Sequence, residues 1–227
     1  MTILEVLPIA ILGGVAGLDT VSFPQAMISR PIVAATFGGA LLGAPARGLL
    51  VGAVLELIAL ETLPVGASRY PEWGSASVVG GAMYARTASV EIGALTATVL
   101  GALFVAWIGG WTMFKLRQRN VVVAARHRAA LDAGARGAVV RVQLAGLTAD
   151  LVRGMALSAL AYVALTPVVS ALLGRWTLSE QWSRATLVAT AASVALGASW
   201  KLFHSTAWAR WCFFGGVGAG LVILWIR

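Results

Sequence analysis

The chain has 227 residues, of which 59% are hydrophobic and only 11% are charged, and its formal net charge is +8. A soluble domain of this length carries about a quarter charged residues, so the composition excludes an ordinary water-soluble fold. The apolar residues form long runs instead of the alternating pattern of a transmembrane barrel. We therefore predict an all-α polytopic membrane protein.

The N-terminal membrane region covers residues 1–114. Its first apolar run, 3–18, follows no basic n-region, so we expect a retained membrane helix rather than a cleaved signal. Pro24, Pro31 and Pro45 interrupt the next run, which also carries charges. This pattern predicts one or two re-entrant or broken helical hairpins that are buried in protein, because lipid does not tolerate an irregular backbone.

The first predicted hairpin has its short arms on either side of Arg30, over residues 20–29 and 31–43. A helix is predicted over residues 48–63. The weakly polar, small-residue stretch 74–86 is a candidate for a second hairpin.

A clear spanning helix is predicted over residues 91–114, and a basic stretch, residues 115–142, follows it. This stretch holds seven basic residues and one acid, Asp132. Basic segments between membrane helices stay on the cytoplasmic side, so we predict a cytoplasmic loop that is partly an amphipathic helix at headgroup level. No groove pattern of basic and aromatic residues accompanies the charge, and we expect no nucleic-acid partner.

The C-terminal membrane region, residues 143–227, contains apolar segments over 143–173, 185–200 and 207–226. We expect Pro167 to break the first of these near one membrane surface. Together with the N-terminal runs, these segments predict about six spanning helices.

Glu56 is the sharpest functional candidate, because a carboxylate inside an apolar helix is costly unless it is paired, hydrated or protonated. It is either a structural ion pair or an acceptor for a hydroxylated solute, since carboxylates form charge-assisted hydrogen bonds with sugar hydroxyls. Asp19 is a helix N-cap for the segment from Thr20, a solute contact, or both. Arg30 is a candidate charge partner for Asp19 or Glu56, or it faces lipid headgroups.

Enzyme signatures are missing from the sequence. There is no phosphate-binding P-loop, no H-E-x-x-H zinc motif and no G-x-S-x-G nucleophile motif. We therefore expect no catalytic residue, no metal site and no cofactor in this chain.

The residues around these charges carry a family resemblance. Residues 17–72 read GLDTVSFPQAMISRPIVAATFGGALLGAPARGLLVGAVLELIALETLPVGASRYPE. The early Leu-Asp, S-R-P, G-x-x-x-G, L-E-L-I-A-L, V-G-A and the Pro-acid pair resemble the signature of the IIC permease subunit of mannose/fructose/sorbose-family phosphotransferase systems (PTS).

The resemblance implies a sugar-translocating subunit in the bacterial cytoplasmic (inner) membrane, with residues 115–142 facing the cytoplasm. It implies an oligomeric complex with a IID membrane subunit and with soluble IIA and IIB phosphocarriers, on which phosphoryl transfer takes place. The implied sugar-binding residues are Asp19, Glu56, Gly66, Ala67 and Glu72.

The chain departs from the family pattern beside the implied site. Glu72 stands where Asp is common, and Pro64 and the Glu61-Thr62 pair replace other residues of the mannose-type pattern. An alternative therefore stays open, in which the chain is a non-transporting scaffold or regulatory sensor of the same family.

Overall fold

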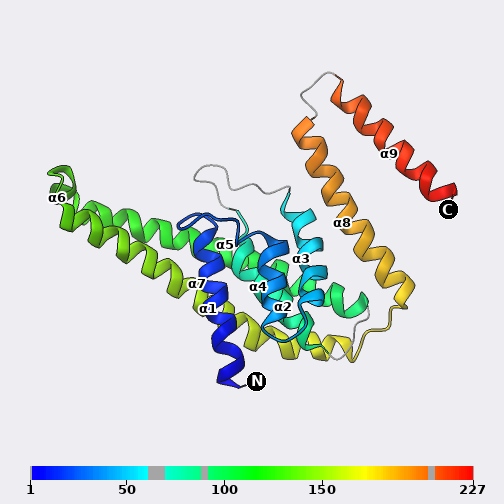
Figure 1. The fold of residues 1–227 in the computed structure, drawn as a ribbon, viewed down its shortest axis with the longest axis horizontal. Coiled ribbons are helices and arrows are strands. Elements are labelled where there is room, and N and C mark those ends of the chain that lie inside the picture. Colours follow the sequence, from blue (N-terminus) through cyan, green and yellow to red (C-terminus); the bar gives the residue numbers. More distant parts are fainter. Residues whose placement is uncertain (1, 61–69, 88–91, 204–207, 227) are drawn as a thin grey trace.

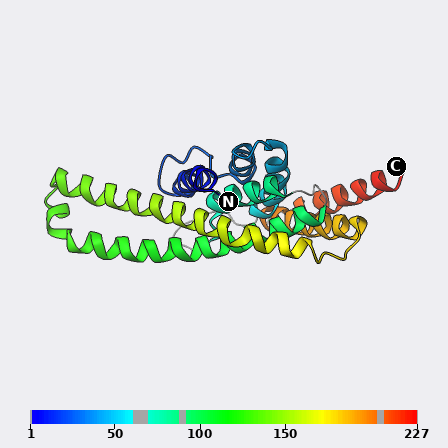
Figure 2. The ribbon, with the colours of Figure 1, turned by 90° about the horizontal axis from the view of Figure 1, so that it is seen from below.

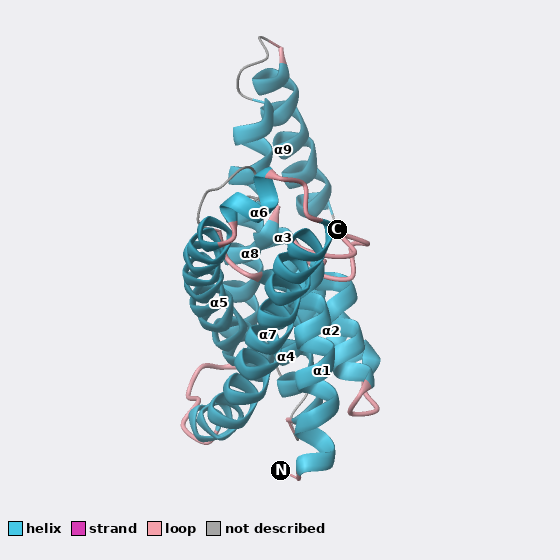
Figure 3. Ribbon diagram, turned by 90° about the vertical axis from the view of Figure 1, so that its left-hand side faces the viewer, coloured by secondary structure: helices cyan, strands magenta, loops and turns pink. Residues whose placement is uncertain are grey.

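The computed structural model describes residues 2–60, 70–87, 92–203 and 208–226 (Figure 1). All regular structure within these ranges is helical, which confirms the predicted all-α class (Figure 3). The helices in chain order are α1 (Ile3–Asp19), α2 (Pro31–Ala40), α3 (Pro45–Ala59), α4 (Trp73–Arg86), α5 (Ile92–Arg126), α6 (Arg128–Asp132), α7 (Arg136–Leu173), α8 (Glu180–Phe203) and α9 (Ala209–Ile226).

The N-terminal hairpin is formed by α2 and α3, not by arms on either side of Arg30. The segment 20–29 has turns and bends, with most of its residues exposed, so the prediction of a buried helical arm there is wrong. Glycines allow α2 and α3 to touch through their backbones, since a Cβ on Gly48 would lie 2.2 Å from the carbonyl oxygen of Ala35. Gly43 has a φ of +74° in the turn between them, a conformation that favours glycine.

Helix α4 is the central element of the fold. It contacts α1, α2, α3, α5 and α7, and its residues from Trp73 to Tyr84 are all buried. The prediction of a second hairpin over 74–86 is therefore wrong. The small residues of this stretch are needed because other helices pack around it closely, as at Gly81, where a Cβ would lie 2.0 Å from the carbonyl oxygen of Ala35.

Helices α5 and α7 form one long antiparallel hairpin, with α6 at its tip (Figure 2). At 1.5 Å per residue, their 35 and 38 residues give lengths of about 52 and 57 Å. The basic stretch 115–142 is the distal part of this hairpin, so the predicted boundaries at residues 114 and 142 both fall inside helices. We call residues 115–142 the basic hairpin.

Pro167 lies inside α7, and the helix continues to Leu173. The predicted break near Pro167 is therefore wrong. Pro167 itself is exposed, whereas Thr166 and Val169 beside it are buried on the face of α7 that packs against other helices. Neighbouring helices allow membrane helices to retain an internal proline.

Helices α8 and α9 extend from the side of this assembly (Figure 1). Helix α8 packs on α3 and α5, and α9 contacts α8, where Trp200 lies against Phe213 and Phe214. Among the described residues, two helices are long and apolar enough to cross a membrane, Gly93–Arg126 and Arg136–Leu173. The figure of about six spans stays a prediction.

Candidate functional site

Asp19 organises the loop that joins α1 to α2. The carboxylate is 1% exposed, and its two oxygens accept hydrogen bonds from the backbone N–H groups of Ala26 (2.6 Å) and Ser29 (2.8 Å). Asp19 therefore does not cap a helix beginning at Thr20. Instead, it closes the loop just before Arg30 and so fixes where α2 begins.

Arg30 and Glu56 form an ion pair across the open end of the α2–α3 hairpin. Arg30 immediately precedes α2, and Glu56 lies near the end of α3. The second oxygen of Glu56 accepts from the backbone N–H of Ile32, at 3.2 Å, in the first turn of α2. The carboxylate thus complements both a guanidinium and the positive end of a helix, while its side chain remains 19% exposed.

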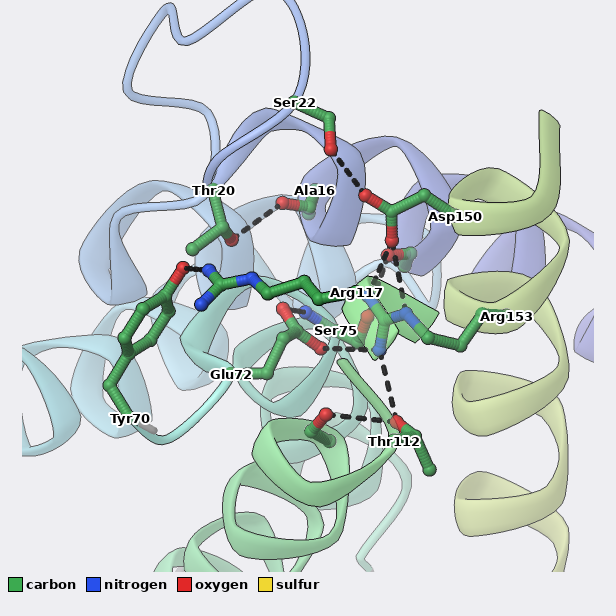
Figure 4. A network of polar contacts seen from close by, with 12 residues as sticks. Ala16, Thr20, Ser22, Tyr70, Glu72, Ser75, Thr112, Arg117, Asp150 and Arg153 are labelled. Atoms are coloured by element: carbon green, nitrogen blue, oxygen red, sulfur yellow. Dashed lines mark hydrogen bonds and ion pairs between the residues drawn. The ribbon is translucent and has the colours of Figure 1, made fainter. Parts of the chain in front are cut away.

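Glu72 is placed by the docking of its own backbone onto α5. Its N–H donates to the carbonyl oxygen of Ala106 at 2.9 Å. A Cβ on Gly110 would lie 2.2 Å from the carbonyl oxygen of Tyr70, so the close approach requires glycine at that position. Arg117 of α5 donates to the Tyr70 hydroxyl and lies over its ring, 4.9 Å from the centroid (Figure 4).

The side chain of Glu72 points into the protein and is fully buried. One carboxylate oxygen accepts from the backbone N–H of Ser75 at 3.0 Å and caps α4. The other oxygen lies 4.0 Å from Arg153 Nη1. Ser75 continues the contact to α1, because its hydroxyl donates to the carbonyl oxygen of Gly13 at 2.9 Å.

Asp150 and Arg153 of α7 complete this cluster, and the sequence reasoning missed both. Asp150 is 1% exposed and accepts from the Ser22 hydroxyl at 2.5 Å and from Arg153 Nε at 3.0 Å. A polar chain therefore runs from the 20–30 loop through α7 to the start of α4 (Figure 4). Two charges three residues apart in an apolar span were the available signal, by the argument that was applied to Glu56.

The predicted site residues therefore fall into three groups. Glu56 is paired with Arg30 and partly exposed, whereas Asp19 and Glu72 are buried and hold backbone N–H groups. Gly66 and Ala67 lie outside the described residues. In the part of the chain that the structure describes, no group of three His, Cys, Asp or Glu side chains could hold a metal ion.

Comparisons with known proteins identify the family. The sequence matches the family model described as the sorbose-specific IIC component of the PTS system over residues 3–214. The PTS system sorbose-specific EIIC component of Klebsiella pneumoniae is 36% identical over 76 residues, which are 34% of this chain and 28% of that protein. The PTS system mannose-specific EIIC component of Escherichia coli K12 is 30% identical over 79 residues, 35% of this chain and 29% of that protein.

The fructose permease IIC component of Bacillus subtilis is 33% identical over 79 residues, again 35% of this chain and 29% of the relative. The matched part of the chain thus spans less than a third of the length of these curated relatives. A solved structure described as "Structure of membrane protein" matches with a TM-score of 0.69 and 19% sequence identity. The match covers 100% of this chain and 96% of the chain in that structure. That similarity establishes a shared fold.

Proposed function

We propose that this chain, which belongs to the sorbose-specific IIC component family of the phosphotransferase system, is a sugar-translocating membrane subunit. The observation that carries the proposal is the Arg30–Glu56 pair at the open end of the α2–α3 hairpin. It combines a carboxylate acceptor with a guanidinium donor in a partly exposed position. Adjacent sugar hydroxyls both donate and accept hydrogen bonds, so such a pair suits them.

The other predicted residues have supporting roles in this proposal. Asp19 sets the loop before Arg30, and Glu72 fixes the chain where it enters α4. Gly66 and Ala67 are proposed to allow the sugar to approach the backbone. Asp19 and Glu72 reach the sugar only if the loop or α4 moves, because both carboxylates are buried.

The proposed complex contains a IID membrane subunit and soluble IIA and IIB phosphocarriers, which carry out phosphoryl transfer. The chain itself is proposed to be a permease subunit and no enzyme. It lies in the bacterial cytoplasmic membrane, with the basic hairpin on the cytoplasmic side, where its seven basic residues satisfy the positive-inside preference.

Replacement of Glu56 tests the site. In cells that carry the partner subunits, Glu56→Gln should reduce uptake of a radiolabelled hexose by at least about tenfold, because a charge-assisted hydrogen bond is lost. The matched control is Glu180→Gln, since Glu180 of α8 is half exposed and its contact with Arg184 is long, at 3.9 Å. Undiminished uptake by Glu56→Gln, with equal amounts of protein in the membrane, would reject the assignment.

One observation favours the second candidate function, a non-transporting scaffold or sensor. Both oxygens of Glu56 already have partners in the chain, Arg30 and the N–H of Ile32, as expected of a purely structural residue. A wild-type chain that assembles with its IID partner and binds none of sorbose, mannose or fructose would support this alternative.

A further inference from the structure

A cavity of about 420 Å³ lies between α5 and α7 at the base of the basic hairpin. Its polar wall is formed by Ser22, Arg119, Asn120 and Gln143. Small residues of α7, among them Ala145, Gly146 and Ala149, also line the cavity, and a Cβ on Gly146 would lie 3.6 Å from the side-chain nitrogen of Asn120. The volume falls within the usual range of about 300–1,000 Å³ for small-ligand sites.

The polar wall consists mainly of groups that lack a partner within the described chain. The side chains of Arg119, Asn120 and Gln143 form no hydrogen bond or ion pair with another described residue. Arg119 and Gln143 are exposed, so a ligand can reach them. Two amide groups and one guanidinium together offer several N–H donors at one place.

The charge around the cavity is positive. Arg119 belongs to the basic hairpin, which has seven cations and one acid. Asp150 is connected to the cavity through Ser22, but its carboxylate is engaged by Arg153. The polar wall therefore suits an anion with several acceptor oxygens, while the rest of the lining is apolar and includes Val123, Val142 and Leu147.

From this geometry we infer that the cavity binds the phosphate group of a phosphomonoester, with Arg119 as the main ligand and the amides of Asn120 and Gln143 as further donors. Guanidinium groups bind phosphate through two parallel hydrogen bonds. A phosphorylated sugar is the ligand class that fits the volume and the amides. That choice of carrier rests on the proposed function, whereas the phosphate site itself does not.

Ser22 connects this site to the buried cluster. Its hydroxyl lies on the wall of the cavity and donates to Asp150, which in turn holds Arg153 beside Glu72. A ligand that engages Ser22 competes for this hydrogen bond. Because Ser22 belongs to the loop that Asp19 organises, ligand binding in the cavity changes a hydrogen bond of that loop.

Protection of a cysteine from alkylation tests the proposal. The 227-residue chain, carrying Cys212→Ser and Ala124→Cys, is placed in phosphatidylcholine nanodiscs and treated with N-ethylmaleimide. Glucose 6-phosphate should slow alkylation, while glucose alone should have little effect. A chain with Ala133→Cys, at the exposed tip of the hairpin, should show no protection.

Two arginine variants provide the matched comparison. Arg119→Gln should raise the half-protecting concentration by at least about tenfold, because it removes a charged hydrogen-bond donor. Arg126→Gln makes the same charge change about two turns farther along α5, outside the cavity, and should change this concentration by less than about twofold because the charge is screened there.

A second experiment identifies the source of the phosphate. Alkylation in phosphatidylglycerol nanodiscs without soluble ligand is compared with alkylation in phosphatidylcholine nanodiscs. Slower alkylation that Arg119→Gln abolishes would confirm the phosphate site and identify a lipid headgroup as its ligand. Absence of protection in both experiments, or equal responses of the two arginine variants, overturns the proposal. Protection that persists in a chain without sugar uptake would reject transport and leave the phosphate site standing.

Discussion

Arg153 lies between two buried carboxylates: its Nη2 atom is 2.9 Å from Asp150 Oδ1, and its Nη1 atom is 4.0 Å from Glu72 Oε2. The Arg153 side chain is only 10% exposed. One guanidinium therefore neutralises acids from α7 and from the start of α4, in a place where water provides little screening.

Arg153→Gln should destabilise the protein strongly, because it removes the guanidinium that lies beside both buried carboxylates. Breaking a buried ion pair costs about 3–5 kcal/mol. The measurement is the unfolding free energy in mixed micelles. The control is Arg184→Gln, which removes a largely exposed contact with Glu180 and should cost no more than about 1 kcal/mol. Equal stability of the two variants would show that Arg153 does not hold the cluster together.

Gly110→Ala should displace the Tyr70–Glu72 segment from α5. The added Cβ would meet the carbonyl oxygen of Tyr70 at 2.2 Å, and forcing an extra methyl group into a close contact costs about 1–3 kcal/mol. The matched control is Gly216→Ala in α9, where an added Cβ would have no atom of the described residues within 4 Å apart from its own stretch of helix. That change should be neutral or stabilise by up to about 1 kcal/mol through helix propensity. The prediction fails if both alanine variants unfold at the same denaturant concentration.

Asp19→Asn should loosen the 20–30 loop without unfolding α1. The N–H groups of Ala26 and Ser29 donate to different oxygens of Asp19, and asparagine replaces one of these oxygens with an NH2 group, which cannot accept from an N–H donor. Hydrogen exchange should accelerate in residues 20–30 and remain unchanged in the middle of α1. In the control Asp132→Asn, at the exposed end of α6, exchange in this loop should match the wild type.

The sequence predicted the helical class and the short helix that begins at Pro31, because hydropathy and proline positions report these directly. It did not predict that the basic stretch continues α5 and α7. The charges of this stretch indicate that it lies in water and not in lipid, but they do not indicate a loop. Alanine and arginine favour a helix in both environments. The prediction of a second re-entrant hairpin over residues 74–86 was wrong, because the small residues there reflect burial among other helices.

The candidate site was predicted only in part, because the sequence indicates single charged residues but not which of them contact one another. The apolar context indicates Glu56 and the family resemblance indicates Glu72, but only the fold shows that Glu72 faces Arg153 while Glu56 faces Arg30. Asp150 and Arg153 belong to a helix that looked like an ordinary span. Their importance depends on contacts with residues about 80 to 130 positions away, which local spacing does not reveal.

The most direct test of the sugar-site proposal is equilibrium binding of a radiolabelled hexose to the reconstituted chain and its IID partner. Wild-type protein is compared with the exchanged pair, Arg30→Glu combined with Glu56→Arg, which retains an ion pair between α2 and α3. We predict that the exchanged protein assembles normally but loses hexose binding, because acceptor and donor have changed places. Wild-type affinity in the exchanged protein would contradict the proposal that Glu56 and Arg30 recognise the sugar.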